Sequence, residues 1–277
     1  MISFQKNIFS SKISKLDSVS SLQIFNIIRF GTTVLIGILL AKSGLPTGEI
    51  AIYEAFLFFS NMVSFFWIGG GQNAILQFFP KITGSDKAKI FFNIWILFLC
   101  GSLLAASFLF LGKDIILNLS SFETAPPFDL LCLFIVFNTP AWLVHIFYLL
   151  KDKHKMILIY GVTTFLLQII IVVLPIWLGF SLRASFLGLV VLAILKFFWS
   201  ILVILKYSNR ELNFSLVKKY SILALPLVLH VLLGSSVEYI DGLIVTNHFE
   251  DDIFAIFRYG AKELPLTLLL IGALAMA

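Results

Sequence analysis

Long stretches of apolar residues dominate the sequence, and their length limits what the chain can fold into. A helix that crosses the hydrocarbon core of a bilayer needs about 20 mostly apolar residues. The runs lack the strict apolar–polar alternation that is typical of membrane strands. Eight stretches qualify, at residues 20–43, 50–70, 90–112, 127–150, 156–180, 184–206, 220–245 and 253–277. The sequence therefore predicts an all-α polytopic membrane protein with eight transmembrane helices.

The composition excludes an ordinary soluble protein. Of the 277 residues, 60% are hydrophobic and 13% are charged, whereas about 25% of the residues in a soluble domain are charged. The net charge of +5 fits basic cytoplasmic loops better than nucleic-acid binding. The two cysteines, Cys100 and Cys132, lie inside apolar runs without metal-ligand spacing. We therefore expect membrane lipids as partners, no nucleic acid, no metal and no cofactor.

Basic residues alternate along the connecting segments and predict an orientation. Thirteen lysines and arginines fall in residues 1–19, 151–155 and 206–219 and in an expected loop at 71–89, whereas three fall in the other connections. Because basic loops stay in the cytoplasm, we expect a cytoplasmic N-terminus. Residues 1–19 fit either a short interfacial helix or a frayed basic terminus.

The last residues lie within an apolar stretch, so we expect the sequence to continue beyond Ala277. A weak repeat supports this, since two short motifs recur about 203–204 residues apart: Ala51-Ile52-Tyr53 as Ala255-Ile256-Phe257, and Ile68-Gly69 as Ile271-Gly272. Such repeats are common in transporters. We expect an interfacial segment at 1–19, a six-helix bundle at 20–206, and helices 7 and 8 of a second bundle at 207–277.

Ionisable residues inside the spans are functional candidates, because each costs about 2.5–3.5 kcal/mol at the centre of a lipid-facing helix. Eight occur: Arg29, Lys196, Arg258, Lys262, Glu54, Glu238, Asp241 and Glu263. Helical spacing aligns Gln23, Asn26, Arg29 and Thr33 in one polar stripe, and His230, Gly234, Glu238 and Asp241 in another. This pattern predicts a polar cavity lined by spans 1, 2, 7 and 8, with spans 90–112 and 156–180 facing lipid or serving as scaffold.

Alternative interpretations remain for several of these residues. Glu54, Glu238, Asp241, Arg258, Lys262 and Glu263 also fit positions near helix ends, from which side chains reach the membrane interface. Lys196 either lines the cavity or pairs with a carboxylate. Gly69–Gly71 lacks the continuation of a phosphate-binding loop and is interpreted as a flexible turn. No catalytic motif is recognisable, so we expect that the protein is not an enzyme.

Four segments carry a resemblance to a known family: GLPTGEIAIY at 44–53, GGGQNAILQF at 69–78, IDGLIV at 240–245 and FAIFRYGAK at 254–262. Together with the polar first helix, they resemble the polysaccharide-exporter branch, with its Wzx-type O-antigen flippases, of the multidrug/oligosaccharidyl-lipid/polysaccharide exporter superfamily. Gln77 stands where that family usually has an arginine before the phenylalanine, which puts any role of this position in doubt.

The resemblance implies a protein of 12–14 helices in two bundles in the bacterial inner membrane. It implies that an undecaprenyl-pyrophosphate-linked oligosaccharide is flipped from the inner to the outer leaflet, by alternating access, for lipopolysaccharide biosynthesis. Arg29 and Arg258 match cavity arginines on helices 1 and 8 of related flippases, whereas helix 2 carries Glu54 instead. The expected substrate-binding residues are Gln23, Asn26, Arg29, Lys196, Arg258 and Lys262. The expected ion-coupling residues, for H⁺ or Na⁺, are Glu54, Glu238 and Asp241.

Two other functions remain open from the sequence. A cation-coupled multidrug exporter of the same superfamily favours a cavity dominated by carboxylates. An O-antigen polymerase or ligase, which is an enzyme, is expected to carry a large external loop. The spans contain four ionisable residues of each sign, which does not decide between the two kinds of exporter.

Overall fold

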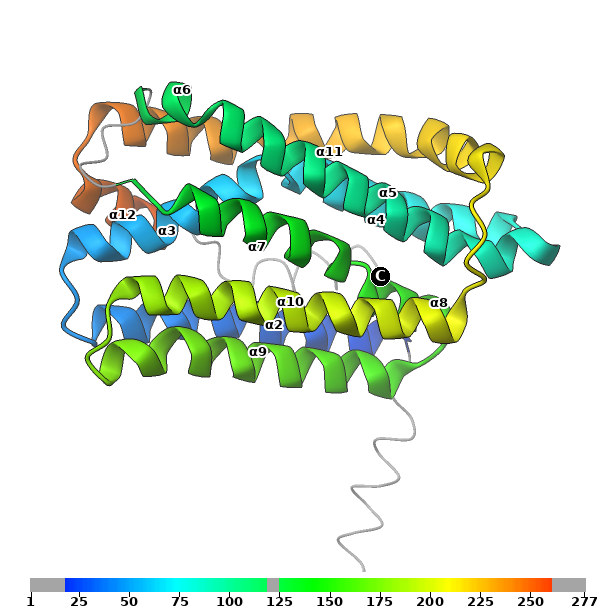
Figure 1. Ribbon diagram of the computed structural model, residues 1–277, viewed down its shortest axis with the longest axis horizontal. Helices are drawn as coiled ribbons and strands as arrows, with labels where there is room; N and C mark the ends of the chain where they lie inside the picture. Colours follow the sequence, from blue (N-terminus) through cyan, green and yellow to red (C-terminus); the bar gives the residue numbers. More distant parts are fainter. Residues whose placement is uncertain (1–17, 119–124, 261–277) are drawn as a thin grey trace, which may run out of the picture.

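The computed structural model describes residues 18–118 and 125–260, and these residues form helices joined by short connections. Within these described residues, six helical segments are long and apolar enough to cross a bilayer. They are α2 (Ser18–Ala41), α5 (Gly84–Leu111), α7 (Phe128–Ala141) continued by α8 (Val144–Leu150), α9 (His154–Trp177), α10 (Leu182–Tyr207) and α11 (Phe214–His248). The described part of the chain is therefore all-helical, as expected of a multi-pass membrane protein (Figure 1).

The second expected span, 50–70, is not one straight helix. It divides into α3 (Thr47–Met62) and α4 (Phe65–Phe78), which meet at a bend of 49°. At the break, the Ser64 hydroxyl donates to the Ser60 carbonyl at 2.7 Å, and the Trp67 indole N–H donates to the Val63 carbonyl at 3.0 Å. Side-chain hydrogen bonds of this kind bend helices and satisfy the backbone groups that the bend releases.

Two local expectations next to this bend are wrong. The expected loop at 71–89 is mostly helical, because α4 continues to Phe78, the short helix η1 covers Phe79–Lys81, and α5 begins at Gly84. The expected turn at Gly69–Gly71 lies inside α4, against α11. A Cβ atom at Gly70 would overlap the backbone of Val228. The glycines therefore allow two helices to approach closely rather than letting the chain turn.

The eighth expected span, 253–277, is described only at its beginning. The helix α12 (Asp251–Gly260) covers this part and packs against α3. Residues 261–277, with Lys262 and Glu263, lie outside the described residues, as does the segment 1–17. The total of eight spans and the two-bundle repeat therefore remain predictions. A further short helix, α6 (Lys113–Asn118), follows α5.

The helices run roughly parallel or antiparallel to the long axis of the molecule. In Figure 1, α2, α9 and α10 lie on one side, α4, α5 and α11 lie on the other, and α7 lies between them. One apolar cluster holds Phe79, Phe91 and Leu216 near one end of the helices. A second cluster holds Leu40, Tyr53 and Phe254 near the opposite end. The space between the clusters is where polar residues gather.

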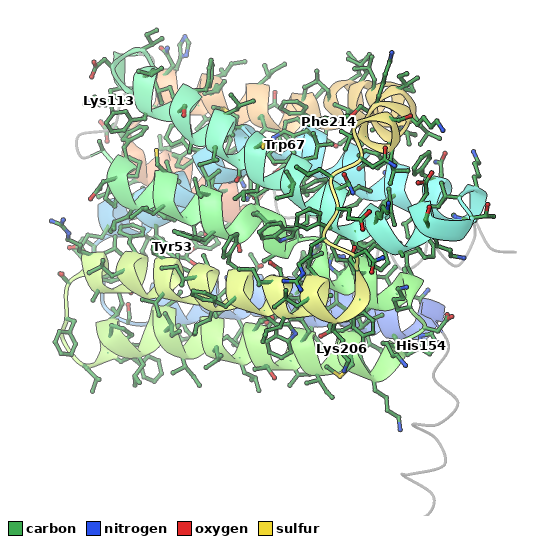
Figure 2. All side chains as sticks on the ribbon, turned by 45° about the vertical axis from the view of Figure 1, so that its right-hand side comes forward. Tyr53, Trp67, Lys113, His154, Lys206 and Phe214 are labelled. Atoms are coloured by element: carbon green, nitrogen blue, oxygen red, sulfur yellow. The ribbon has the colours of Figure 1, made fainter. Side chains whose placement is uncertain are left out.

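Basic residues concentrate at one end of the helices, where α5, α9 and α11 begin and α10 ends. Lys206, His154 and Phe214 mark this end in Figure 2, and Lys113 marks the opposite one. The ten expected cytoplasmic lysines and arginines that the structure describes lie here: Lys81, Lys87, Lys89, Lys151, Lys153, Lys155, Lys206, Arg210, Lys218 and Lys219. Burial, together with the charge of nearby Lys87, lowers the pKa of Lys151. The side of the membrane on which this end lies stays a prediction.

A polar network fixes the linker between α10 and α11 at this basic end. The Asn93 side chain donates to the Glu211 carbonyl at 2.9 Å and accepts from the Asn213 N–H at 2.8 Å. Lys89 and Glu211 form an ion pair. Asn213 also caps α11, because its side chain accepts from the Leu216 N–H at 3.1 Å. The network therefore determines where α11 begins relative to α5.

Candidate functional site

A polar cavity of about 860 Å³ lies within the membrane-spanning helices, between the two apolar clusters. Its walls come mainly from α2, α3, α7, α9 and α10, and α11 and α12 contribute one residue each. Six of the nine site residues that the sequence predicted line it: Gln23, Asn26, Arg29, Lys196, Glu238 and Arg258. Within the described residues, the cavity is lined mostly by helices of the expected first bundle.

Helix α2 presents its predicted polar stripe to this cavity. Gln23, Asn26, Arg29 and Thr33 follow one another at helical spacing and all line the wall. The Thr33 hydroxyl donates to the Arg29 carbonyl at 3.2 Å, so its own hydrogen-bonding need is met within the helix. The amide and guanidinium groups of the other three residues are then the polar groups that α2 offers to a ligand.

A proline break shapes the wall opposite α2. Helix α7 ends at Ala141, one residue after Pro140, which has no N–H to donate to the carbonyl of the preceding turn. The Ala141 carbonyl accepts from the Tyr160 hydroxyl at 3.2 Å, and the Trp142 carbonyl accepts from the Gln72 side chain at 2.7 Å. The break thus places Trp142 between two helices, with its ring beside α2.

Arg29 and Lys196 give the cavity its net positive charge, because the other two charged residues of its wall, Glu238 and Arg258, pair with each other. The Arg29 guanidinium carbon lies 5.2 Å from the centroid of the Trp142 ring, which is a cation–π arrangement. Within residues 18–118 and 125–260, neither Arg29 nor Lys196 forms an ion pair with a carboxylate. Buried charges are ordinarily paired in proteins. Because the described part of the chain offers these two cations no carboxylate, the cavity is attractive to an anion.

Arg258 differs because the protein supplies its counter-charge. Its Nη1 donates to Glu238 Oε1 at 3.1 Å, an ion pair that joins α12 to α11. Its guanidinium carbon also lies 5.2 Å from the centroid of the Phe58 ring. The Glu238 side chain is 57% exposed, whereas that of Arg258 is 11% exposed. The pair is thus accessible from the carboxylate side, at the edge of the cavity.

The other three predicted site residues are not among those that line the cavity. Glu54 is 2% exposed, and its electrostatic neighbour is the phenol of Tyr259 on α12. Asp241 is exposed on α11, outside the cavity wall. Lys262 lies outside the described residues. Among the predicted ion-coupling residues, Glu238 alone is placed at the cavity in the part of the chain that the structure describes.

Neutral polar and aromatic residues of the wall were missed by the sequence analysis. Helix α9 lines the cavity with Tyr160, Thr164 and Gln168, so the expectation that span 156–180 faces lipid or acts as scaffold is corrected. Asn138, Trp142 and His145 line it from α7 and α8. Both sets are spaced by three or four residues, like the stripe on α2, but neither contains a lysine, an arginine or a carboxylate to draw attention to it.

Asn138 and His145 illustrate which groups this part of the wall presents to the cavity. The Asn138 Oδ1 atom is buried and has no hydrogen-bond partner among the described residues. His145 is buried and stacks on Phe25, with ring centroids 4.5 Å apart. The wall therefore combines an unused acceptor with flat aromatic surfaces.

Comparisons with protein-family models, with curated proteins and with solved structures find no match for this chain.

Proposed function

We propose that the chain belongs to a transporter that moves an undecaprenyl-pyrophosphate-linked oligosaccharide from the inner to the outer leaflet of the bacterial inner membrane. The transport proceeds by alternating access and serves polysaccharide biosynthesis, with no catalytic step. One observation carries the proposal. Arg29 and Lys196 line a cavity inside the membrane-spanning region, and neither has a carboxylate partner among the described residues.

The charge pattern suits a pyrophosphate. Arginine presents a planar fork of donors that binds phosphate oxygens in pairs, and lysine adds a mobile ammonium group. These interactions strengthen where protein and lipid exclude water, because the local dielectric constant is low. Arg29 is held in position by the Trp142 ring. An anionic ligand would supply the counter-charge that these two residues lack.

The remaining wall suits an oligosaccharide. Gln23, Asn26 and Asn138 offer amide donors and acceptors for hydroxyl groups, and the Asn138 acceptor is unused within the described protein. Aromatic rings such as those of Trp142 and Tyr160 offer flat surfaces for the apolar faces of sugar rings. A multidrug exporter for cations is less well supported, because the carboxylate known to line the cavity, Glu238, is paired with Arg258.

Glu238 is the residue through which we expect a coupling ion to act. A proton or Na⁺ at this accessible carboxylate would neutralise it and release Arg258 from the ion pair. Arg258 would then add a third positive charge to the cavity. Binding of the coupling ion and of the anionic substrate would in this way favour each other.

The experiment is transfer of a fluorescent undecaprenyl-pyrophosphate-linked saccharide between the leaflets of proteoliposomes that contain the full protein. We expect Arg29→Ala to slow transfer at least about tenfold, the effect of losing one charged hydrogen bond. Arg183→Ala is the matched control, because Arg183 is exposed at the start of α10, outside the cavity wall. Equal rates for the two variants, or no transfer by the wild-type protein, would contradict the proposal.

A further inference from the structure

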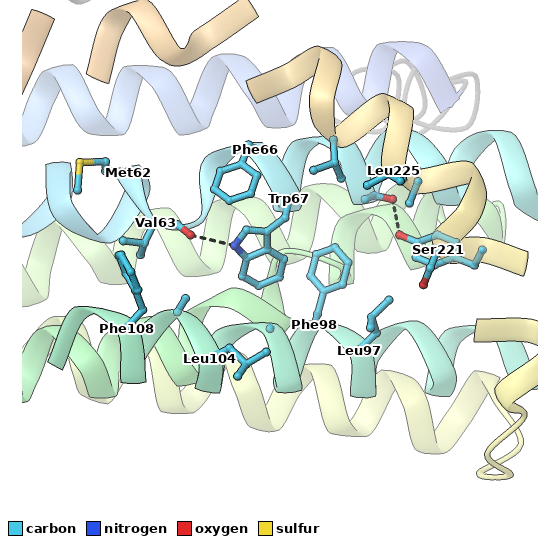
Figure 3. A pocket seen from close by; sticks show the side chains of 16 residues that line it. Met62, Val63, Phe66, Trp67, Leu97, Phe98, Leu104, Phe108, Ser221 and Leu225 are labelled. Atoms are coloured by element: carbon cyan, nitrogen blue, oxygen red, sulfur yellow. Dashed lines mark hydrogen bonds between the residues drawn. The ribbon is translucent and has the colours of Figure 1, made fainter. Parts of the chain in front are cut away.

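A second cavity, of about 680 Å³, lies between α4, α5 and α11. We refer to it as the apolar groove (Figure 3). Trp67 lies near its middle, Met62 and Phe108 at one end, and Leu97 and Ser221 at the other. The Trp67 indole N–H donates to the Val63 carbonyl at 3.0 Å, and the Tyr220 hydroxyl donates to the Gly71 carbonyl at 2.8 Å. Because these polar atoms are already bonded, the groove offers a ligand an apolar surface.

The groove opens at the outer surface of two membrane-spanning helices. Its rim residues Leu104, Phe108 and Leu225 are 72%, 69% and 60% exposed. A soluble protein seldom exposes a contiguous apolar surface of this kind. Because α5 and α11 are long and apolar enough to cross a bilayer, we expect hydrocarbon to surround this part of them. The chains of membrane lipids are therefore the molecules that meet the opening.

The length of the groove matches one leaflet. From Leu97 to Phe108, α5 rises about 16 Å at 1.5 Å per residue, which is about half of the 30 Å hydrocarbon core. The groove begins about one helical turn beyond Asn93, where the polar network of the α10–α11 linker is located. It therefore extends inward from the basic end over the depth that a single acyl chain occupies.

A positively charged residue lies just beyond the groove, on the side of the basic end. Ser221, Leu225 and Val228 line the groove from one face of α11. Lys218 lies three residues before Ser221, so it continues the same face by one turn, and it is exposed. A lysine near the surface of the membrane attracts anionic headgroups. An apolar groove that ends at such a lysine is complementary to a lipid with a negatively charged headgroup.

We propose that the apolar groove binds one acyl chain of an anionic phospholipid from the leaflet at the basic end, with the headgroup phosphate at Lys218 and Ser221. The site is separate from the polar cavity and does not depend on the transport function. The lipid would fill the space beside the bend between α3 and α4. Its chain would thereby cover apolar surface that these helices leave open.

The location of the chain is tested by photo-crosslinking. Phosphatidylglycerol with a diazirine in one acyl chain is mixed with the full protein in detergent, and the labelled peptides are identified by mass spectrometry. We expect labels within residues 97–108 and 220–228. Ala105→Trp, which fills the groove, should reduce this labelling at least about fivefold. Leu202→Trp is the matched control on an exposed face of α10 and should leave it unchanged.

Labels elsewhere in the wild-type protein, or equal labelling of the two tryptophan variants, would overturn the proposal. The wild-type map does not require that either variant folds. Displacement of the phospholipid by a lower concentration of a polyprenyl monophosphate would also overturn it, because an isoprenoid chain would then be the occupant.

The headgroup contact is tested by native mass spectrometry with phosphatidylglycerol and with the zwitterionic phosphatidylcholine. Lys218→Gln should weaken phosphatidylglycerol binding about fivefold, the equivalent of about 1 kcal/mol for one lysine near the membrane surface. Lys219→Gln is the matched control, because Lys219 is also exposed but lies on a different face of α11. Equal affinities of the two variants, or equal binding of both lipids by the wild-type protein, would exclude a headgroup at Lys218.

Discussion

The polar cavity and the apolar groove lie in the same helical assembly, but they differ in whether their polar groups find partners within the protein. In the groove, the Trp67 N–H and the Tyr220 hydroxyl are bonded to backbone carbonyls. In the cavity, Arg29 and Lys196 have no carboxylate partner, and Asn138 Oδ1 has no hydrogen-bond partner, among the described residues. Polar groups that are hydrogen-bonded within the protein stabilise the fold, whereas buried polar groups without a partner can form that bond with a ligand instead.

The two sites also differ in how the helices create them. The cavity follows from the break after Pro140, which places Trp142 beside Arg29. The groove lies beside the bend between α3 and α4 and beside the glycines at which α11 approaches α4 closely. Irregular backbone is tolerated at membrane depth where neighbouring groups restore the lost hydrogen bonds. The break after Pro140 and the bend between α3 and α4 thus each lie next to a site.

Of the substitutions that distinguish the two sites, we expect a charge reversal in the polar cavity to have the largest effect. Lys196→Glu should weaken binding of a polyprenyl pyrophosphate at least about a hundredfold, because an attraction becomes a repulsion in a medium of low dielectric constant. The measurement is affinity by native mass spectrometry. Lys113→Glu, at the far end of α5, is the control and should bind normally. If Lys196→Glu bound the polyprenyl pyrophosphate as tightly as the wild-type protein, the polar cavity would not be the anion-binding site.

The next largest effects are expected from truncating one tryptophan in each site, Trp67 in the groove and Trp142 in the cavity. Trp67→Ala should lower the free energy of unfolding by about 3 kcal/mol, near the lower end for truncation of an aromatic core residue. It should not change pyrophosphate affinity. Trp142→Ala should weaken that affinity about fivefold, through loss of a cation–π contact worth about 1 kcal/mol. Thermal unfolding and ligand binding are measured on both variants, and an affinity loss in Trp67→Ala would contradict the separation.

The smallest expected effects are two changes of about 1 kcal/mol in the free energy of unfolding, with opposite signs in the two sites. Asn138→Leu removes a buried acceptor that has no partner among the described residues, so it should raise the unfolding temperature while it slows saccharide transfer. Tyr220→Phe removes the hydrogen bond from the Tyr220 hydroxyl to the Gly71 carbonyl, so it should lower the unfolding temperature and leave transfer unchanged. A fall in stability for Asn138→Leu would show that its side chain is satisfied in the protein.

Much of the fold could be predicted from residue order. The apolar runs that predicted spans at 20–43, 90–112, 127–150, 156–180, 184–206 and 220–245 coincide with the six long apolar helices. The predicted polar stripe on α2 lines the cavity, since helical spacing alone determines which residues share a face. The bend at Ser64 and the helical continuation through residues 71–89 escaped prediction, because hydropathy reports where apolar residues end and not where a helix ends.

The sequence by itself determined that the chain is a multi-pass helical membrane protein, and that Arg29 shares one helix face with Gln23 and Asn26. These are local properties, fixed by the number of consecutive apolar residues and by the helical repeat. The tertiary structure decided that Arg29 and Lys196 share a cavity, that Arg258 pairs with Glu238, and that Glu54 lies outside it. The physical reason is that the rotation of each helix, and hence the groups that its face meets, is set by packing against helices distant in sequence.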